Sequence, residues 1–381
     1  MPKLPLACLL ALLTATAAAA PAPLPPPPDV PAKGYVVLDA FSGRVLVGHN
    51  DTERLEPASL TKLMTSYVVF QALRDHKLRL EDSAPISEHA WRAGGAVSDG
   101  STSYMPLNSQ VRVEDLVQGM IVQSGNDATI ALAEKIAGTE ATFAVLMNQY
   151  AQRLGMKASH FTNAAGLPDP QHYTTARDIA ILGAALVREF PEYYKWFSQR
   201  SFTYNKITQH NRNGLLDRDA TVDGIKTGHT EAAGYCLASS ALRDGMRLVS
   251  VVMGTASPKV REDASETLLG YGFNFFETKR LYSAGQRVGV ATVFKTGDPV
   301  PVALHDDLFA TGQRGELGNA KAQLLLTPRL IAPIAATTVI GRMRVTLGDA
   351  LLADLPVYPA AAVETGSLYR RAVDTVRLWF N

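Results

Sequence analysis

The chain has 381 residues, of which 46% are hydrophobic and 19% are charged, with 37 Lys and Arg against 36 Asp and Glu. This length suggests two domains, and the apolar share is too high for a disordered chain. The near-neutral charge excludes the basic surface of a typical nucleic-acid binder, so we expect no nucleic-acid partner. Only two cysteines occur, Cys8 and Cys236, which excludes a disulfide-rich scaffold and a cysteine-rich metal site.

The first twenty residues, 1–20, have the pattern of a secretory signal peptide. A lysine precedes an apolar run, 4–13, that is too short to span a bilayer as a helix, and the remainder is rich in alanine. We therefore predict export, with cleavage at the alanine-rich end; a retained N-terminal anchor is the alternative. The next segment, 21–33, is rich in proline, and we interpret it as a stiff, solvated linker.

Residues 34–282 are predicted to form a first, larger domain of the α/β (α+β) class. Strand-like runs occur at both ends of this segment, and runs with helical period lie between them. We therefore predict a helical block inserted in an antiparallel sheet that joins the two ends of the segment. The predicted strands are 35–38, 44–47, 234–240 and 247–253, and the predicted helices are 59–73, 113–121, 127–136 and 176–189.

Residues 283–362 are predicted to form a small all-β domain, a β-sandwich. In its last part Met343, Val345 and Leu347 alternate with two arginines and a threonine, which is the pattern of a half-buried antiparallel strand. Proline and glycine punctuate the region, and it contains no helix-period run of ten residues.

The C-terminal segment 363–381 is predicted to end in an amphipathic helix. Leu368, Ala372 and Val376 share one face with 379–380, and three arginines supply positive charge. The stretch is far too short to span a bilayer, so we expect a peripheral anchor that lies in the membrane interface. A terminal helix packed on the β domain is the alternative.

Three short motifs carry candidate chemistry, and the first is Ser59-Leu60-Thr61-Lys62. Its hydroxyl and amine are one helical turn apart, so Lys62 can take the proton of Ser59 if burial lowers the pKa of its amine. The positive end of a helix dipole also favours negative charge that develops there. The S-x-x-K pattern occurs once in this chain, about as often as chance predicts, so alone it is weak support.

The second motif is Ser124-Gly125-Asn126, the only S-x-N pattern in the chain, at the junction of two predicted helices. A tight loop there would direct a hydroxyl and an amide into a cleft. The alternative is a helix N-cap, because serine and asparagine are preferred capping residues.

The third motif is Lys226-Thr227-Gly228, on a predicted edge strand where glycines allow close backbone approach. The same tripeptide recurs at 295–297, where it leads into a turn of the predicted small β domain. We choose Lys226 as the functional copy, because it shares a domain with the other two motifs, and we interpret Lys295 as a surface coincidence.

The order S-x-x-K, S-x-N and K-T-G resembles the motif set of penicillin-binding proteins and class A β-lactamases, with Gly125 in place of the usual aspartate. The stretches 56–62, 123–127 and 222–235 resemble low-molecular-mass penicillin-binding proteins that are serine D-alanyl-D-alanine carboxypeptidases. The resemblance covers nearly all of the mature chain. It implies a β-lactamase-like penicillin-binding catalytic domain followed by the small β domain.

The resemblance also implies roles for individual residues. Ser59 would be the acylated nucleophile, Lys62 its general base, and Ser124 with Lys226 a proton relay to the leaving D-alanine. Backbone N–H groups of Ser59 and His229 would form the oxyanion hole. The implied substrate-binding residues are Asn126, Lys226, Thr227, Gly228, His229 and Arg261, with Arg212 as a weaker candidate.

The implied partners are peptidoglycan stem peptides, β-lactam antibiotics and the surface of the inner membrane, which the enzyme would face from the periplasm. We expect no metal and no other cofactor, because the histidines lack ligand spacing.

Three other functions fit the same motifs. A weak β-lactamase of class A type would need an acidic deacylation base, and residues 157–188 contain no glutamate and only Asp169 and Asp178. A D,D-endopeptidase uses the same machinery, but relatives with that preference usually lack the β domain. A catalytically dead, membrane-tethered peptidoglycan-binding protein would be expected to have lost a motif residue, and none is lost.

Overall fold

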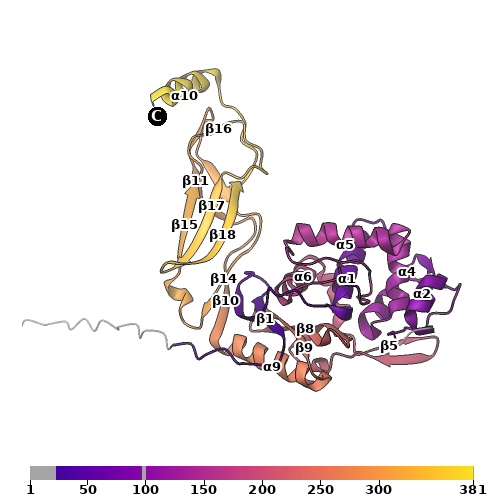
Figure 1. Cartoon of the computed structure of the whole chain (residues 1–381). Coiled ribbons are helices and arrows are strands. Elements are labelled where there is room, and N and C mark those ends of the chain that lie inside the picture. Colours follow the sequence, from indigo (N-terminus) through magenta and orange to yellow (C-terminus); the bar gives the residue numbers. More distant parts are fainter. Residues whose placement is uncertain (1–22, 97–99, 381) are drawn as a thin grey trace, which may run out of the picture.

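The computed structural model describes residues 23–96 and 100–380 (Figure 1). The predicted signal peptide 1–20 lies outside the described residues. The described chain is elongated, with a larger unit of helices and strands, a β unit beside it, and helix α10 (Leu368–Phe380) at the far tip of the β unit.

The larger unit is built on a five-stranded sheet with the order β2-β1-β9-β8-β7. Every neighbouring pair is antiparallel, and β1, from the start of the segment, lies beside β9, from its end. The predicted sheet that joins both ends of the segment is therefore confirmed. Its strands are β1 (Gly34–Asp39), β2 (Val45–His49), β7 (Val222–Thr230), β8 (Gly234–Arg243) and β9 (Met246–Thr255).

Both faces of this sheet are buried, against different helices. In β1, Val36 and Leu38 pack into the cluster made with the helical block, whereas Tyr35 and Val37 pack on the opposite side with residues of α9 (Pro258–Phe275). The alternation follows from the period of two residues in a strand. The sheet is therefore the middle layer of three.

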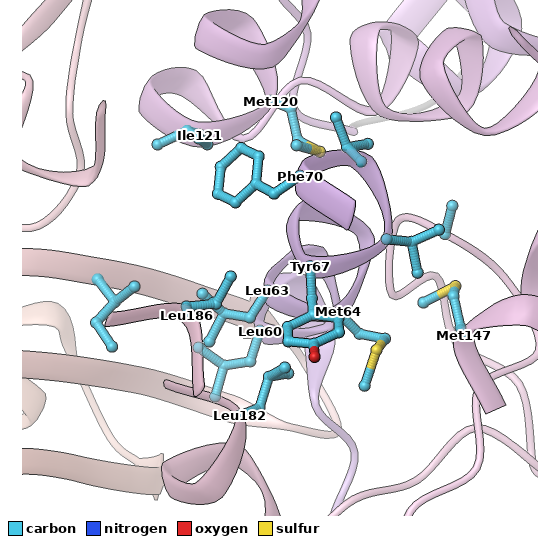
Figure 2. Close-up of a cluster of buried hydrophobic side chains, with 14 of the residues drawn as sticks. Leu60, Leu63, Met64, Tyr67, Phe70, Met120, Ile121, Met147, Leu182 and Leu186 are labelled. Atoms are coloured by element: carbon cyan, nitrogen blue, oxygen red, sulfur yellow. The ribbon is translucent and has the colours of Figure 1, made fainter. Parts of the chain in front are cut away.

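Helix α1 (Lys62–Arg74) runs through the centre of the helical block, and every residue from Lys62 to Leu73 is buried. Figure 2 shows the apolar side chains packed around it, contributed by several helices. The helix predicted from residue 59 differs in its first turn, because Ala58–Thr61 form a 3₁₀ turn and α1 begins at Lys62. The lysine of the first motif is therefore the first residue of a helix that is buried along almost its whole length.

The other predicted helices are present, except that 113–121 divides into α3 and a π-helical turn, Gly119–Gln123. The remaining helices of this unit are α2 (Glu88–Trp91), α3 (Val113–Gln118), α4 (Asn126–Ala137), α5 (Glu140–Leu154), α6 (Ala176–Glu189), α7 (Pro191–Tyr194) and α8 (Leu215–Arg218). Its two small antiparallel strand pairs are β3 (Ser83–Pro85) with β4 (Gln110–Arg112) and β5 (Ser201–Tyr204) with β6 (Ile207–His210).

The β unit holds a five-stranded sheet with the order β11-β13-β18-β17-β15 and two strand pairs, β10 with β14 and β12 with β16. The predicted boundary at residue 282 falls at the end of β10, which pairs with β14, so by strand pairing this unit begins at Phe276. Its strands are β10 (Phe276–Tyr282), β11 (Arg287–Ala291), β12 (Val293–Phe294), β13 (Val300–Ala303), β14 (Leu308–Gln313), β15 (Lys321–Leu326), β16 (Leu330–Ile331), β17 (Gly341–Leu347) and β18 (Ala350–Pro359).

The proline-rich segment differs from the solvated linker that we predicted. The hydroxyl of Tyr271 donates to the carbonyl of Pro25 at 2.8 Å, the hydroxyl of Tyr35 donates to the carbonyl of Pro28 at 3.2 Å, and Val30 is buried. An apolar residue inside the segment and two tyrosine donors therefore hold residues 25–30 against the larger unit.

Candidate active site

The three motifs meet in one cleft of about 720 Å³. Its lining includes Ser59, Ser124, Asn126, Thr227, Gly228, His229 and Arg261, and also Arg212. Lys62 and Lys226 lie beneath this lining and are 1% and 3% exposed. The structure thus brings together the nine predicted site residues and Arg212, the weaker candidate.

Ser59 lies on the 3₁₀ turn that precedes α1, and its side chain is half-buried. The residue before it, Ala58, has a φ of 46°, a left-handed conformation that is uncommon for a residue with a side chain. The chain therefore turns sharply at the serine. Ser59 Oγ lies 3.0 Å from Lys62 Nζ, so the expected contact within the first motif is present.

The amine of Lys62 has three neighbouring acceptors: Ser59 Oγ at 3.0 Å, Asn126 Oδ1 at 2.8 Å and the carbonyl of Ala165 at 2.7 Å. Burial, together with the charge of Arg212 and against the opposing effect of two carboxylates, lowers the pKa of Lys62 to about 7. A neutral amine has two N–H groups and one lone pair. It can therefore keep its bonds to Asn126 and Ala165 while its lone pair faces the serine hydroxyl.

Ser124 lies at the end of the π-helical turn with a φ of 67°, and its buried hydroxyl has no hydrogen-bond partner within the described chain. The alternative of a helix N-cap is wrong, because α4 begins at Asn126 with Gly125 before it and no side-chain cap bond. Asn126 Oδ1 accepts from Lys62, and Nδ2 donates to the carbonyl of Ala93 at 3.2 Å. The second Nδ2 proton is left for a substrate.

The glycine in place of the usual aspartate has a steric reason. A Cβ at Gly125 would lie 2.0 Å from Ser103 Oγ and 2.6 Å from Asp127 Oδ1. Asp127 in turn accepts hydrogen bonds from the backbone N–H groups of Ser103 and Met105. The Asp127 carboxylate, one residue beyond the motif, thus fixes the segment that contains Ser103 and Met105. Asp127 and Ser103 also fill the space that a side chain at position 125 would need.

Strand β7 forms the opposite wall and supplies the third motif. Burial lowers the pKa of Lys226 well below its usual value, and the nearby charges of Lys62, Arg212 and Arg261 add to the effect. Its Nζ donates to the carbonyl of Thr227 at 3.0 Å. A Cβ at Gly228 would lie 3.0 Å from the carbonyl oxygen of Pro57 and 3.3 Å from the nitrogen of Ser59, so glycine lets β7 lie directly against the turn that carries Ser59.

Two arginines make one end of the cleft positive. Arg261 is 5% exposed, its Nη2 donates to the carbonyl of Arg212 at 3.2 Å, and its Nε has no hydrogen-bond partner in the described structure. Arg212 is exposed, and its Nη1 donates to Ser101 Oγ at 2.9 Å. Two guanidinium groups without a carboxylate partner among the described residues suit a ligand that brings one.

The second K-T-G copy is far from this cleft. Lys295 follows β12 in the β unit, and its backbone N–H donates to Asp374 Oδ2 of α10 at 2.7 Å. None of residues 295–297 lines the cleft, and the contact to α10 is made by the backbone of Lys295, so the K-T-G tripeptide has no separate role here that depends on its side chains.

Sequence reasoning missed three contributors to the cleft. The carbonyl of Ala165 binds Lys62, the hydroxyl of Ser101 binds Arg212, and the ring of Tyr235 stacks on His229 with 3.9 Å between centroids. A backbone carbonyl leaves no trace in residue type, so no pattern would have found Ala165. In residues 23–96 and 100–380, no group of three or more His, Cys, Asp or Glu is placed to hold a metal ion.

Comparison with known proteins agrees with this geometry. The family described as D-alanyl-D-alanine carboxypeptidase matches residues 17–257, and the penicillin-binding protein 5 C-terminal domain matches residues 276–365. The chain is 46% identical to the D-alanyl-D-alanine carboxypeptidase DacA of Haemophilus influenzae over 319 residues, 82% of this chain and 80% of that one. It is 41% identical to DacC of Escherichia coli over 356 residues, 92% of this chain and 89% of that one.

Among solved structures, penicillin-binding protein 5 from Haemophilus influenzae matches with a TM-score of 0.82 and 43% identity, covering 89% of this chain and 99% of that chain. Penicillin-binding protein 6B from Escherichia coli matches with a TM-score of 0.71 and 34% identity, covering 87% of this chain and 96% of that chain. These matches confirm the predicted fold class and the resemblance drawn from the motifs. The chain belongs to the family of serine D-alanyl-D-alanine carboxypeptidases.

Proposed function

We propose that this enzyme removes the terminal D-alanine from peptidoglycan pentapeptides through an acyl-enzyme on Ser59, and that β-lactams acylate the same serine. The observation that carries the proposal is the 3.0 Å contact between Ser59 Oγ and Lys62, a buried amine with a pKa of about 7. A base with a pKa near the working pH is suited to accept a proton and to return it.

In the acylation step, Lys62 takes the hydroxyl proton of Ser59 as Oγ attacks the carbonyl of the penultimate D-alanine. The developing oxyanion accepts hydrogen bonds from the backbone N–H groups of Ser59 and His229. These two groups come from facing walls, and the close approach of Gly228 to the serine turn supports their convergence on one oxygen.

The leaving D-alanine needs a proton on its nitrogen and a partner for its carboxylate. Ser124 donates the proton from its otherwise unpartnered hydroxyl and is resupplied by the buried amines of Lys226 and Lys62. Thr227 and Arg261 bind the carboxylate, which Arg212 also faces. An incoming carboxylate would favour the charged form of Lys226 and so couple substrate binding to proton supply. Water then attacks the acyl-enzyme, with the same groups used in reverse.

The contacts of two aspartates favour this function over a class A β-lactamase. Asp178 Oδ2 accepts from the backbone N–H of Ala158 at 2.9 Å and from Ser159 Oγ at 2.7 Å. Asp169 Oδ1 accepts from the backbone N–H of Gln171 at 2.7 Å. Both carboxylates hold local structure, so neither is placed as a deacylation base.

The direct test is to incubate the purified protein with a pentapeptide that ends in D-Ala-D-Ala. We expect stoichiometric release of D-alanine, measured by a D-amino-acid oxidase assay, and inhibition by penicillin. Cleavage only of cross-linked dimer peptides would instead identify an endopeptidase.

The two K-T-G copies give a matched pair of variants. Lys226→Ala should slow acylation by penicillin about 10²-fold or more, because it removes a buried amine from the site where charge develops. Lys295→Ala should leave acylation unchanged, since the contact of Lys295 with α10 is a backbone hydrogen bond to Asp374 that alanine can also make. The rate of labelling by a fluorescent penicillin measures both. Equal effects, or a larger effect at Lys295, would show that the wrong copy was chosen.

We further propose that the protein is exported and that α10 attaches it to the periplasmic face of the inner membrane. Leu368, Tyr369 and Val376 are 80%, 78% and 52% exposed, which leaves an apolar face uncovered. The polar side of the helix holds the β unit through Asp374 and through Arg370, which donates to the carbonyl of Gly297. No helix in the described residues is long and apolar enough to span a membrane.

Removal of the helix tests this attachment. Deletion of residues 366–381 should abolish co-sedimentation with anionic vesicles and leave release of D-alanine from a soluble pentapeptide within twofold, because the cleft lies in the other unit. Val376→Asp should weaken vesicle binding in the full chain, because it places a charge on the exposed apolar face. A truncated protein that still sediments with vesicles, or that is folded and inactive, would contradict the anchor.

A further inference from the structure

One acidic side chain, Glu231, lines the cleft among the described residues. It is exposed at the first position after β7, in the turn to β8. Among the described residues no lysine or arginine forms an ion pair with it, and the nearby Lys33 donates from Nζ to the carbonyl of Ala232 at 3.4 Å. The cleft is therefore bipolar, with Arg212 and Arg261 as its positive groups and one carboxylate near the tip of β7.

The direction in which a substrate lies follows from the order of groups along β7. Thr227 binds the terminal carboxylate and the N–H of His229 binds the oxyanion, so the substrate residues before the scissile bond extend past His229 toward the end of the strand. β7 is the last strand of its sheet. Backbone N–H and C=O groups of one strand residue face the same edge, so the His229 carbonyl is also offered to the substrate backbone.

Glu231 lies within reach of a substrate side chain. It follows His229 by two residues, at the first position of the turn that leads to β8, and so lies at the end of β7 toward which the substrate extends. The substrate residue before the two D-alanines is one residue upstream of the attacked carbonyl. A side chain with a four-carbon stem can extend from the substrate backbone and bring its terminal amine toward the Glu231 carboxylate. Leu167, 38% exposed, lines the same cleft and offers apolar surface to the stem.

We propose that Glu231 is a specificity residue that selects peptides with a side-chain ammonium group on the residue preceding D-Ala-D-Ala. This selectivity rests on the carboxypeptidase activity proposed above. Glu231 binds the ammonium as an ion pair at the cleft mouth and takes no part in the proton transfers. The enzyme thus binds two charged groups of one peptide, the carboxylate at its end and an ammonium on the residue two positions earlier.

The test compares two pentapeptides that differ only at the third residue, which is L-lysine in one and L-norleucine in the other. Wild type should favour the lysine peptide in kcat/KM for D-alanine release by about threefold to fivefold, the upper range for an exposed ion pair, mainly through KM. Glu231→Gln should abolish this preference and leave the norleucine peptide unchanged. Glu53→Gln, an exposed residue outside the cleft lining, makes the same change in net charge and should keep the preference.

A charge swap completes the design. Glu231→Lys should disfavour the lysine peptide and favour a peptide with L-glutamate at the third residue. The proposal is overturned if Glu231→Gln keeps the wild-type preference, or if it slows both peptides equally. Failure of the proposed function has a different signature, since then wild type releases D-alanine from neither peptide.

Discussion

Ser59→Ala should eliminate both covalent labelling by penicillin and release of D-alanine. Loss of the nucleophile from a serine hydrolase lowers kcat by about 10⁶-fold, which brings the rate to background. A β-lactam amide mimics the scissile bond, and its opened ring stays attached to the acyl-enzyme, so labelling reports the nucleophile directly. Intact-protein mass spectrometry after incubation with penicillin should show one adduct in wild type and none in the variant.

Ser198→Ala is a suitable control, because Ser198 is exposed and its hydroxyl donates only to the carbonyl of Lys195. It should label and turn over like wild type. Circular dichroism should show that Ser59→Ala is folded, since the Ser59 side chain is half-buried and leaves the packed core of α1 intact. Labelling that survives in Ser59→Ala would place the nucleophile elsewhere.

The sequence predicted most of the scaffold because hydrophobic period and burial agree there. α6 begins at Ala176 and ends at Glu189, as its helical period indicated, and β1 with β9 form the predicted closure of the sheet. α5 and α9 were missed. In both helices small and polar residues interrupt the apolar stripe, so the period is weak in the sequence although packing makes it helical.

The site was accessible to sequence reasoning as a set of motifs, and only the fold explains their state. The pKa of Lys62 depends on burial and on Arg212, which is 150 residues away along the chain. The conformation of Ser124 depends on a π-helical turn that no residue pattern marked. The residue types of the motifs indicated a serine nucleophile with a lysine base. The packing of the fold lowers the pKa of that lysine, so that it can act as a base.

The amine of Lys62 has to be neutral to act as a base, which makes acylation depend on pH. Desolvation disfavours the ammonium form, so burial lowers the pKa of Lys62 to about 7. Below this value a proton occupies the lone pair and the serine cannot be deprotonated; above it the base is free. His172 is a second buried group near the site, but burial lowers its pKa to about 4, so it stays neutral through this range.

We therefore expect the rate of acylation by penicillin to fall as pH is lowered from 8 to 5, with a midpoint near 7. Lys62→Ala should reduce the rate at pH 8 by about 10²- to 10⁴-fold, the usual contribution of a general base. Lys62→Arg is the sharper variant, because a guanidinium keeps the positive charge and does not deprotonate in this range. It should be as slow as Lys62→Ala, and its rate should show no rise with pH.

Stopped-flow measurement with a fluorescent penicillin between pH 5 and 9 gives the pH profiles of wild type and both variants. Wild-type rates that do not change with pH, or a Lys62→Arg variant that keeps the rise, would assign the titrating base to another group. Lys226 would then be the group to examine, since its buried amine also has a lowered pKa.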